Sequence, residues 1–151
     1  ALKAAAEGVA AAAETIGEAL DDIDTGVRRE AARVLATRPD TRSREVLLLA
    51  LFDANLPAVA AAYVFYIRAG VPGTEKTLIE ALNAGGWPVM AHDFATCGNE
   101  ALATAGREWM RARNHDPSAC RCFGMLRPIW GQWLHPADIR SWPHPPGAGG
   151  R

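Results

Sequence analysis

Leu47-Leu48-Leu49-Ala50-Leu51 belongs to a short apolar pattern that occurs three times and decides the fold. The other copies are Ile16-Gly17-Glu18-Ala19-Leu20 and Leu78-Ile79-Glu80-Ala81-Leu82, each displaced by 31 residues from the next. Within each copy, matching apolar residues recur at i, i+3 and i+4, which places them on one stripe of a helix. The pattern therefore predicts a repeated helix with one buried face.

The same offset relates the residues at helix starts. Ser43 maps onto Thr74, and both precede apolar runs, where a hydroxyl is expected to cap free backbone amides. Pro57 maps onto Pro88, and both suit the start of a second helix, where the missing amide hydrogen does no harm. The predicted first helices lie near residues 10–21, 44–53 and 75–84, and the second helices near 27–37, 57–69 and 88–96. A further helix, capped by Asn99, is expected to run to about Asn114.

Paired helices cannot bury their apolar faces alone, so the copies must stack into a continuous core. The expected fold is all-α: an α-solenoid (α-α superhelix) of stacked antiparallel helix pairs, with the repeat array over residues 1–116. Six of the ten prolines lie from Pro117 onward, and residues 117–151 are expected to form an irregular, flexible tail. Its Trp130, Trp133 and Trp142 form a recognition segment, fold back over an end of the array, or belong to an ending without an evolved role.

Two segments carry a family resemblance. Residues 20–35, Leu-Asp-Asp-Ile-Asp-Thr-Gly-Val-Arg-Arg-Glu-Ala-Ala-Arg-Val-Leu, resemble a HEAT repeat of the short kind also seen in phycobilisome lyases. Residues 90–102, with Trp109 beyond them, are similar to the closing segment of many bacterial HEAT-repeat proteins. The resemblance implies core positions for Val27, Ala31, Ala32 and Leu35, and a pair between Arg28 and an acidic turn residue, Asp22 or Asp24. Val59 and Met90 replace Arg28 in the later copies, so the family's ladder of Asp–Arg pairs is incomplete.

Composition narrows the classes of function. The formal net charge is -1 and the pI is about 6.5, which gives no global argument for nucleic acid or an anionic membrane as partner. No run approaches the ~18 apolar residues that a membrane span needs. Three cysteines do not make an even disulfide framework, which indicates a reducing compartment, here the cytoplasm. Because residue 1 is alanine, we expect that the chain opens inside a longer array or is a processed form.

Metal and catalytic patterns are weak. Cys120-Arg121-Cys122 is one residue short of a Cys-x-x-Cys hook, no second hook follows, and Cys97, His92 and His115 complete no zinc spacing. His92-Asp93 lacks an accompanying phosphate loop or nucleophile elbow. We therefore expect no metal, no cofactor and no enzymatic activity.

The predicted function is a non-catalytic scaffold that binds another protein or an extended peptide. The second helices of stacked pairs line a concave face, so the expected partner-binding groove comprises Arg28, Arg29, Arg33, Tyr63, Tyr66 and His92. Alternatively, the arginines form a solvated helix face, and the apolar helix that carries the tyrosines packs in the core. Two other functions stay open: a bilin-lyase-like or regulatory subunit that cradles a protein and its prosthetic group, and a HEAT-like nucleic-acid binder of the alkyl-base glycosylase kind. Nothing in the sequence fixes the oligomeric state.

Overall fold

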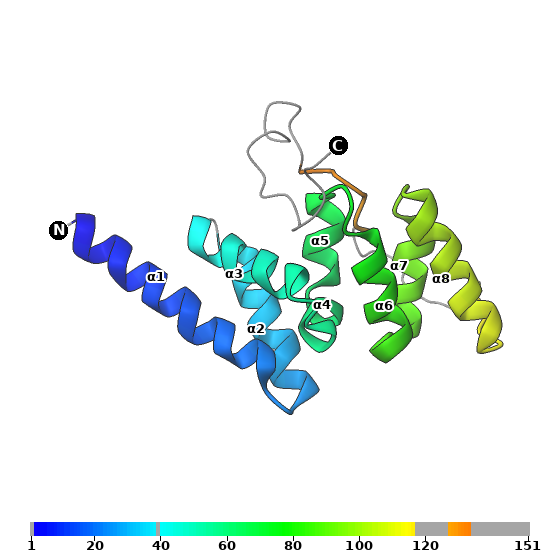
Figure 1. The fold of residues 1–151 in the computed structure, drawn as a ribbon, viewed down its shortest axis with the longest axis horizontal. Helices are drawn as coiled ribbons and strands as arrows, with labels where there is room; N and C mark the ends of the chain where they lie inside the picture. Colours follow the sequence, from blue (N-terminus) through cyan, green and yellow to red (C-terminus); the bar gives the residue numbers. More distant parts are fainter. Residues whose placement is uncertain (1, 39, 117–126, 134–151) are drawn as a thin grey trace. The chain divides into compact units, whose positions relative to one another are not determined.

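The computed structural model describes residues 2–38, 40–116 and 127–133, and every regular element in them is a helix (Figure 1). The all-α expectation is confirmed for this part of the chain. The elements are α1 (Leu2–Glu18), the 3-10 turn η1 (Ala19–Asp21), α2 (Thr25–Thr37), α3 (Thr41–Phe52), α4 (Leu56–Ala61), α5 (Tyr63–Ala69), α6 (Glu75–Gly85), α7 (Pro88–Thr96) and α8 (Glu100–Ala112). None of these helices has the length and apolar character needed to cross a membrane.

Internal contacts divide the chain into two compact units: unit 1, residues 1–62, and unit 2, residues 63–151. The division falls inside the helix predicted over residues 57–69, which is broken at Ala62 into α4 and α5. Each unit is therefore described by itself. The domain boundary predicted at Pro117 lies outside the described residues and stays a prediction.

Helix boundaries follow the predicted pairs closely, with one large difference. Helix α1 begins at Leu2 rather than near residue 10. Its first turns are exposed and bury no apolar stripe, but they are rich in alanine, the residue with the highest intrinsic helix propensity. Propensity rather than amphipathic pattern therefore extends this helix.

Capping confirms some of the predicted helix starts and corrects others. Asn99 accepts the backbone amide of Leu102 at 3.1 Å, as expected of a capping residue. Pro57 and Pro88 stand in the first turn of α4 and α7, also as expected. The prediction that Ser43 caps a helix is wrong, because α3 starts earlier, at Thr41, and its N-cap is Asp40. Thr74 precedes α6, but its hydroxyl donates to the Val71 carbonyl at 2.7 Å and caps no amide.

Unit 1 buries the repeated apolar stripe. Helix α3 packs against α1, and α4 packs against α2 (Figure 1). The core includes Leu20, Ala31, Ala32, Leu35, Leu47, Leu51, Ala58 and Val59. The resemblance to HEAT repeats placed Val27 in this core as well, and that placement is wrong: its side chain is 41% exposed. Val27 lies in the first turn of α2, on a side that no described element of unit 1 covers.

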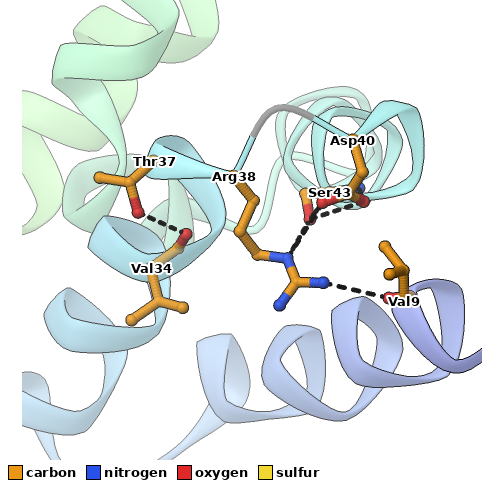
Figure 2. A network of polar contacts seen from close by, with 6 residues as sticks. All are labelled: Val9, Val34, Thr37, Arg38, Asp40 and Ser43. Carbon is orange, nitrogen blue, oxygen red and sulfur yellow. Dashed lines mark hydrogen bonds and ion pairs between the residues drawn. The ribbon is translucent and has the colours of Figure 1, made fainter. Parts of the chain in front are cut away.

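A polar network joins the α2–α3 turn to α1 (Figure 2). Asp40 accepts the Ser43 amide at 2.8 Å and the Arg38 Nε at 3.0 Å. Arg38 also donates through Nη2 to the Val9 carbonyl of α1, at 3.2 Å. Partial burial acts to raise the pKa of Asp40, but the hydrogen bonds from Ser43 and Arg38 outweigh it and hold that pKa below its usual range. One carboxylate therefore caps α3 and orients the arginine that ties the turn to α1.

Unit 2 is built around the closely packed pair α7 and α8. Gly106 of α8 approaches the α7 backbone so closely that an added Cβ would lie 2.3 Å from the Ala91 carbonyl oxygen. The Trp109 indole donates to the Leu82 carbonyl at 3.1 Å and so joins α8 to the end of α6. Phe94, Met90 and Leu102 are fully buried between these helices.

Residues 127–133, inside the predicted flexible tail, pack against α5 and the end of α7 within unit 2, and we call them the C-terminal strap. Trp130, Gly131 and Trp133 donate their backbone amides to the carbonyls of Cys97, Ile67 and Arg68, at 2.8, 2.9 and 3.0 Å. These contacts fit the alternative that Trp130 and Trp133 fold back, while the flexibility of the tail stays a prediction. Trp142 and the rest of the predicted tail lie outside the described residues.

Candidate interaction sites

A shallow groove runs between α1 and α2 on the surface of unit 1, with a volume of about 620 Å³. Carbon dominates its surface, and an open apolar groove of this kind is typical of protein-interaction sites. Its lining comprises Thr15, Ile16, Ala19, Asp24, Gly26, Val27, Glu30, Ala31 and Val34. We call it the α1–α2 groove.

The 31-residue offset shows what this groove corresponds to elsewhere in unit 1. Ala58, the equivalent of Val27, is fully buried, and so is Leu47, the equivalent of half-buried Ile16. Val46, the equivalent of groove residue Thr15, lies against α1, where a Cβ on Gly17 would be 2.7 Å from its Cγ1 atom. The side of α3 that faces α1 therefore corresponds to the side of α1 that lines the groove.

The three arginines predicted for a binding groove lie on α2 but do not line the α1–α2 groove. Arg28 donates to the carbonyls of Asp22 and Ile23, at 2.8 and 3.0 Å, so the expected pair with an acidic side chain is wrong. Its guanidinium instead donates hydrogen bonds to carbonyls of the turn before α2, while Asp24 caps the helix. Arg29 is exposed.

Arg33 forms an ion pair with Glu30 at 2.6 Å, one turn away on α2. The hydrogen bond from Arg33 lowers the pKa of Glu30, and both side chains are well exposed. Because Glu30 also lines the α1–α2 groove, this pair gives the groove a charged rim. Exposed pairs of this kind contribute little to stability and more to the choice of partner.

The other three predicted groove residues lie in unit 2 and are buried. Tyr63 is 6% exposed, Tyr66 1% and His92 8%. Burial raises the pKa of Tyr66, so its hydroxyl stays protonated. The rings of Tyr63 and Trp87 meet edge to face, with centroids 5.5 Å apart. This burial agrees with core packing, which was one of the two alternatives that the sequence left open for the helix carrying the tyrosines.

Asp93 forms a buried polar cluster with Tyr63, a role that the sequence did not suggest. The Tyr63 hydroxyl donates to its Oδ2 atom at 2.5 Å. Burial raises the pKa of Asp93, against the opposing effects of that hydrogen bond and of the charges of His92, Arg127 and Arg68. The sequence did contain a signal for this role, because Asp93 is acidic whereas the equivalent positions of the earlier copies are Ala31 and Ala62. A carboxylate at such a buried position needs either a ligand or a hydrogen-bonding partner in the core.

Burial raises the pKa of the Cys97 thiol, which donates to the Phe94 carbonyl at 3.2 Å, so the thiol is a poor nucleophile. Within residues 2–38, 40–116 and 127–133, no three His, Cys, Asp or Glu side chains are grouped as metal ligands are. Cys120 and Cys122 lie outside the described residues.

Comparison of the chain with models of protein families, with curated proteins and with solved structures found no match. The assignment of a function to this chain rests on its own residues and geometry.

Proposed function

We propose that this chain is a non-catalytic protein-interaction module of HEAT-like helix pairs, which binds a partner through the α1–α2 groove. The 31-residue recurrence of helix, turn and helix supports stacking as an α-solenoid. The odd number of cysteines and the protonated, buried thiol of Cys97 support a reducing compartment such as the cytoplasm.

The observation that carries the proposal is the exposure of Val27 in the groove. Its equivalent in the next copy is fully buried, and Val46, the equivalent of Thr15, packs on α1. Residues of this groove thus correspond to residues that, in the next copy, are buried or packed against the preceding helix pair. Small and aliphatic groups such as Ala19, Val27 and Ala31 allow a helix to approach closely.

The proposed occupant is an amphipathic helix pair of a partner protein, with small and aliphatic residues on its contact face. The Glu30–Arg33 ion pair at the rim offers both signs of charge to the polar edge of such a helix. Helix-in-groove recognition of this kind depends on apolar anchors spaced by three and four residues. The bilin-lyase-like and nucleic-acid-binding alternatives are not favoured by any contact in the described residues.

The chain offers a matched pair of variants to test this proposal. Val27→Glu places a charge in the groove, while Val9→Glu makes the same change on α1 outside the groove, at almost equal exposure (41% and 40%). Wild type and both variants are immobilised as full chains after circular dichroism confirms their folding. Proteins retained from a source lysate are quantified by mass spectrometry, and each candidate is purified and titrated by calorimetry.

The expected result is a partner that binds wild type and Val9→Glu alike and binds Val27→Glu at least roughly tenfold more weakly, because a charge must be desolvated at the interface. Equal binding of the purified partner by all three proteins would refute the groove as its site. A partner that prefers nucleic acid-bound or chromophore-bound chain would favour one of the alternatives.

A further inference from the structure

The C-terminal strap occupies a set of acceptors that helices normally leave open. The last carbonyls of an α-helix have no partner within the helix. At the end of α5, the Ile67 and Arg68 carbonyls accept the amides of Gly131 and Trp133, and beyond α7 the Cys97 carbonyl accepts the amide of Trp130. Three fixed acceptors therefore match three amides of one short segment.

Side chains add a requirement for sequence. The Trp133 ring lies edge to face against Phe65, with centroids 5.8 Å apart, and the Arg68 guanidinium lies 5.5 Å from the centre of the same ring. Such aromatic and cation–π contacts stabilise an interface beyond the area that they bury. Main-chain hydrogen bonds combined with a contact surface for specific side chains are a general mode of peptide recognition.

A contact between two glycines makes the match selective. Gly70 follows α5 with φ 58°, and a Cβ on it would lie 2.4 Å from the Gly131 Cα atom. Gly131 itself has φ 71°, a conformation that β-branched residues rarely adopt. The segment that fits therefore favours glycine over a β-branched residue directly after the first tryptophan.

The strap is only partly enclosed, with Pro128 buried and Trp130 half-buried. Trp133 is 46% exposed and Ile129 56% exposed, so about half of each side chain stays in water while docked. The strap is held by three main-chain hydrogen bonds and by the contacts of the Trp133 ring, and a short segment held in this way can open without global unfolding. A ligand in trans could therefore compete with it.

From these contacts we infer that the ends of α5 and α7 form a docking site for Trp-Gly-X-Trp segments in a turn conformation, which residues 130–133 of the chain itself fill. The strap is then an intramolecular ligand that a separate peptide can displace. This site lies within unit 2 and does not depend on the proposed α1–α2 groove.

The test uses the full chain and a fluorescein-labelled heptapeptide with the sequence of residues 127–133. Gly131→Val in the chain strains the strap and opens the site, whereas the acceptor residues are unchanged. Fluorescence anisotropy should show saturable binding of the peptide to this variant, at least roughly tenfold tighter than to wild type. The reason is that a tethered segment competes at an effective concentration on the order of millimolar.

Two controls examine the glycine contact. A heptapeptide carrying the Gly131→Val change should bind neither protein, and adding Gly70→Ala to the Gly131→Val chain should abolish binding of the unmodified peptide. If Gly131→Val unfolds unit 2 by circular dichroism, the Trp133→Ala chain replaces it, because that change removes only ring contacts. Absence of saturable binding to the folded, opened chain up to about 1 mM peptide, or equal binding of both peptides, would overturn the inference.

Discussion

Gly106→Ala is the change for which the structure gives the clearest expected magnitude. An added Cβ at Gly106 would lie 2.3 Å from the Ala91 carbonyl oxygen and 2.8 Å from the Ala95 amide nitrogen. Both are backbone atoms of α7, so they cannot rotate away as a side chain would. Overpacking of this kind typically costs 1–3 kcal/mol, or more where backbone must shift.

Helix propensity acts in the opposite direction. Replacing glycine by alanine in a helix stabilises it by up to about 1 kcal/mol. The net expectation is a loss of about 1–2 kcal/mol in the free energy of unfolding, because the steric contribution is the larger. Gly8→Ala is the matched control: nothing lies within 4 Å of the added Cβ, so it should stabilise α1 slightly.

The assay can follow unit 2 alone. All five tryptophans of the chain lie after residue 62, so urea denaturation monitored by tryptophan fluorescence reports on unit 2. The midpoint should fall for Gly106→Ala and stay unchanged for Gly8→Ala. A Gly106→Ala midpoint at or above that of wild type would mean that α7 and α8 do not approach as described.

Three further predictions concern polar groups. Asp40→Ala should lose about 1–2 kcal/mol at pH 7, the usual range for a helix cap. Because the folded pKa of Asp40 is depressed, its contribution is present above about pH 4 and is lost as pH falls through the folded pKa, so the gap between wild type and variant in thermal melts should narrow below about pH 4, and a constant gap would contradict this. Asp93→Asn should flatten the pH dependence of the stability of unit 2 above about pH 4, because a raised pKa makes the Asp93 contribution greatest at low pH and lost as pH rises through the folded pKa. An unchanged profile in fluorescence-monitored urea titrations would show that Asp93 is readily ionised in its place. Asn99→Ala should lower the unit 2 midpoint by an amount equivalent to about 1 kcal/mol, and no shift would show that water replaces this cap.

The sequence predicts the helices well because their cause is local. The spacing of Leu20, Leu51 and Leu82 marks each first helix, and all three side chains are buried. Pro57 and Pro88 locate the second helices for the same reason, since a proline constrains its own backbone. Errors arise where two local signals compete: Asp40 and Ser43 both suit a cap, and only the fold shows that the serine hydroxyl donates to the aspartate.

The candidate sites are harder to predict because they depend on residues far apart in the chain. Val27 matches a core position of the HEAT pattern, yet its exposure depends on whether another element covers the first pair. The fit of Gly70 to Gly131 joins positions 61 residues apart, and neither glycine carries a pattern that relates it to the other. Tyr63 and Tyr66 were ambiguous from sequence, because an aromatic ring suits a core and a binding surface equally well.

Hydrogen–deuterium exchange of the full chain, alone and with the purified partner from the capture experiment, tests the central proposal most directly. We expect slower exchange in peptides covering residues 15–34, which include the lining of the α1–α2 groove, and no change in α8. The Val27→Glu chain at the same partner concentration should show no such protection. Protection confined to unit 2, with residues 15–34 unaffected, would refute binding of the partner in the α1–α2 groove.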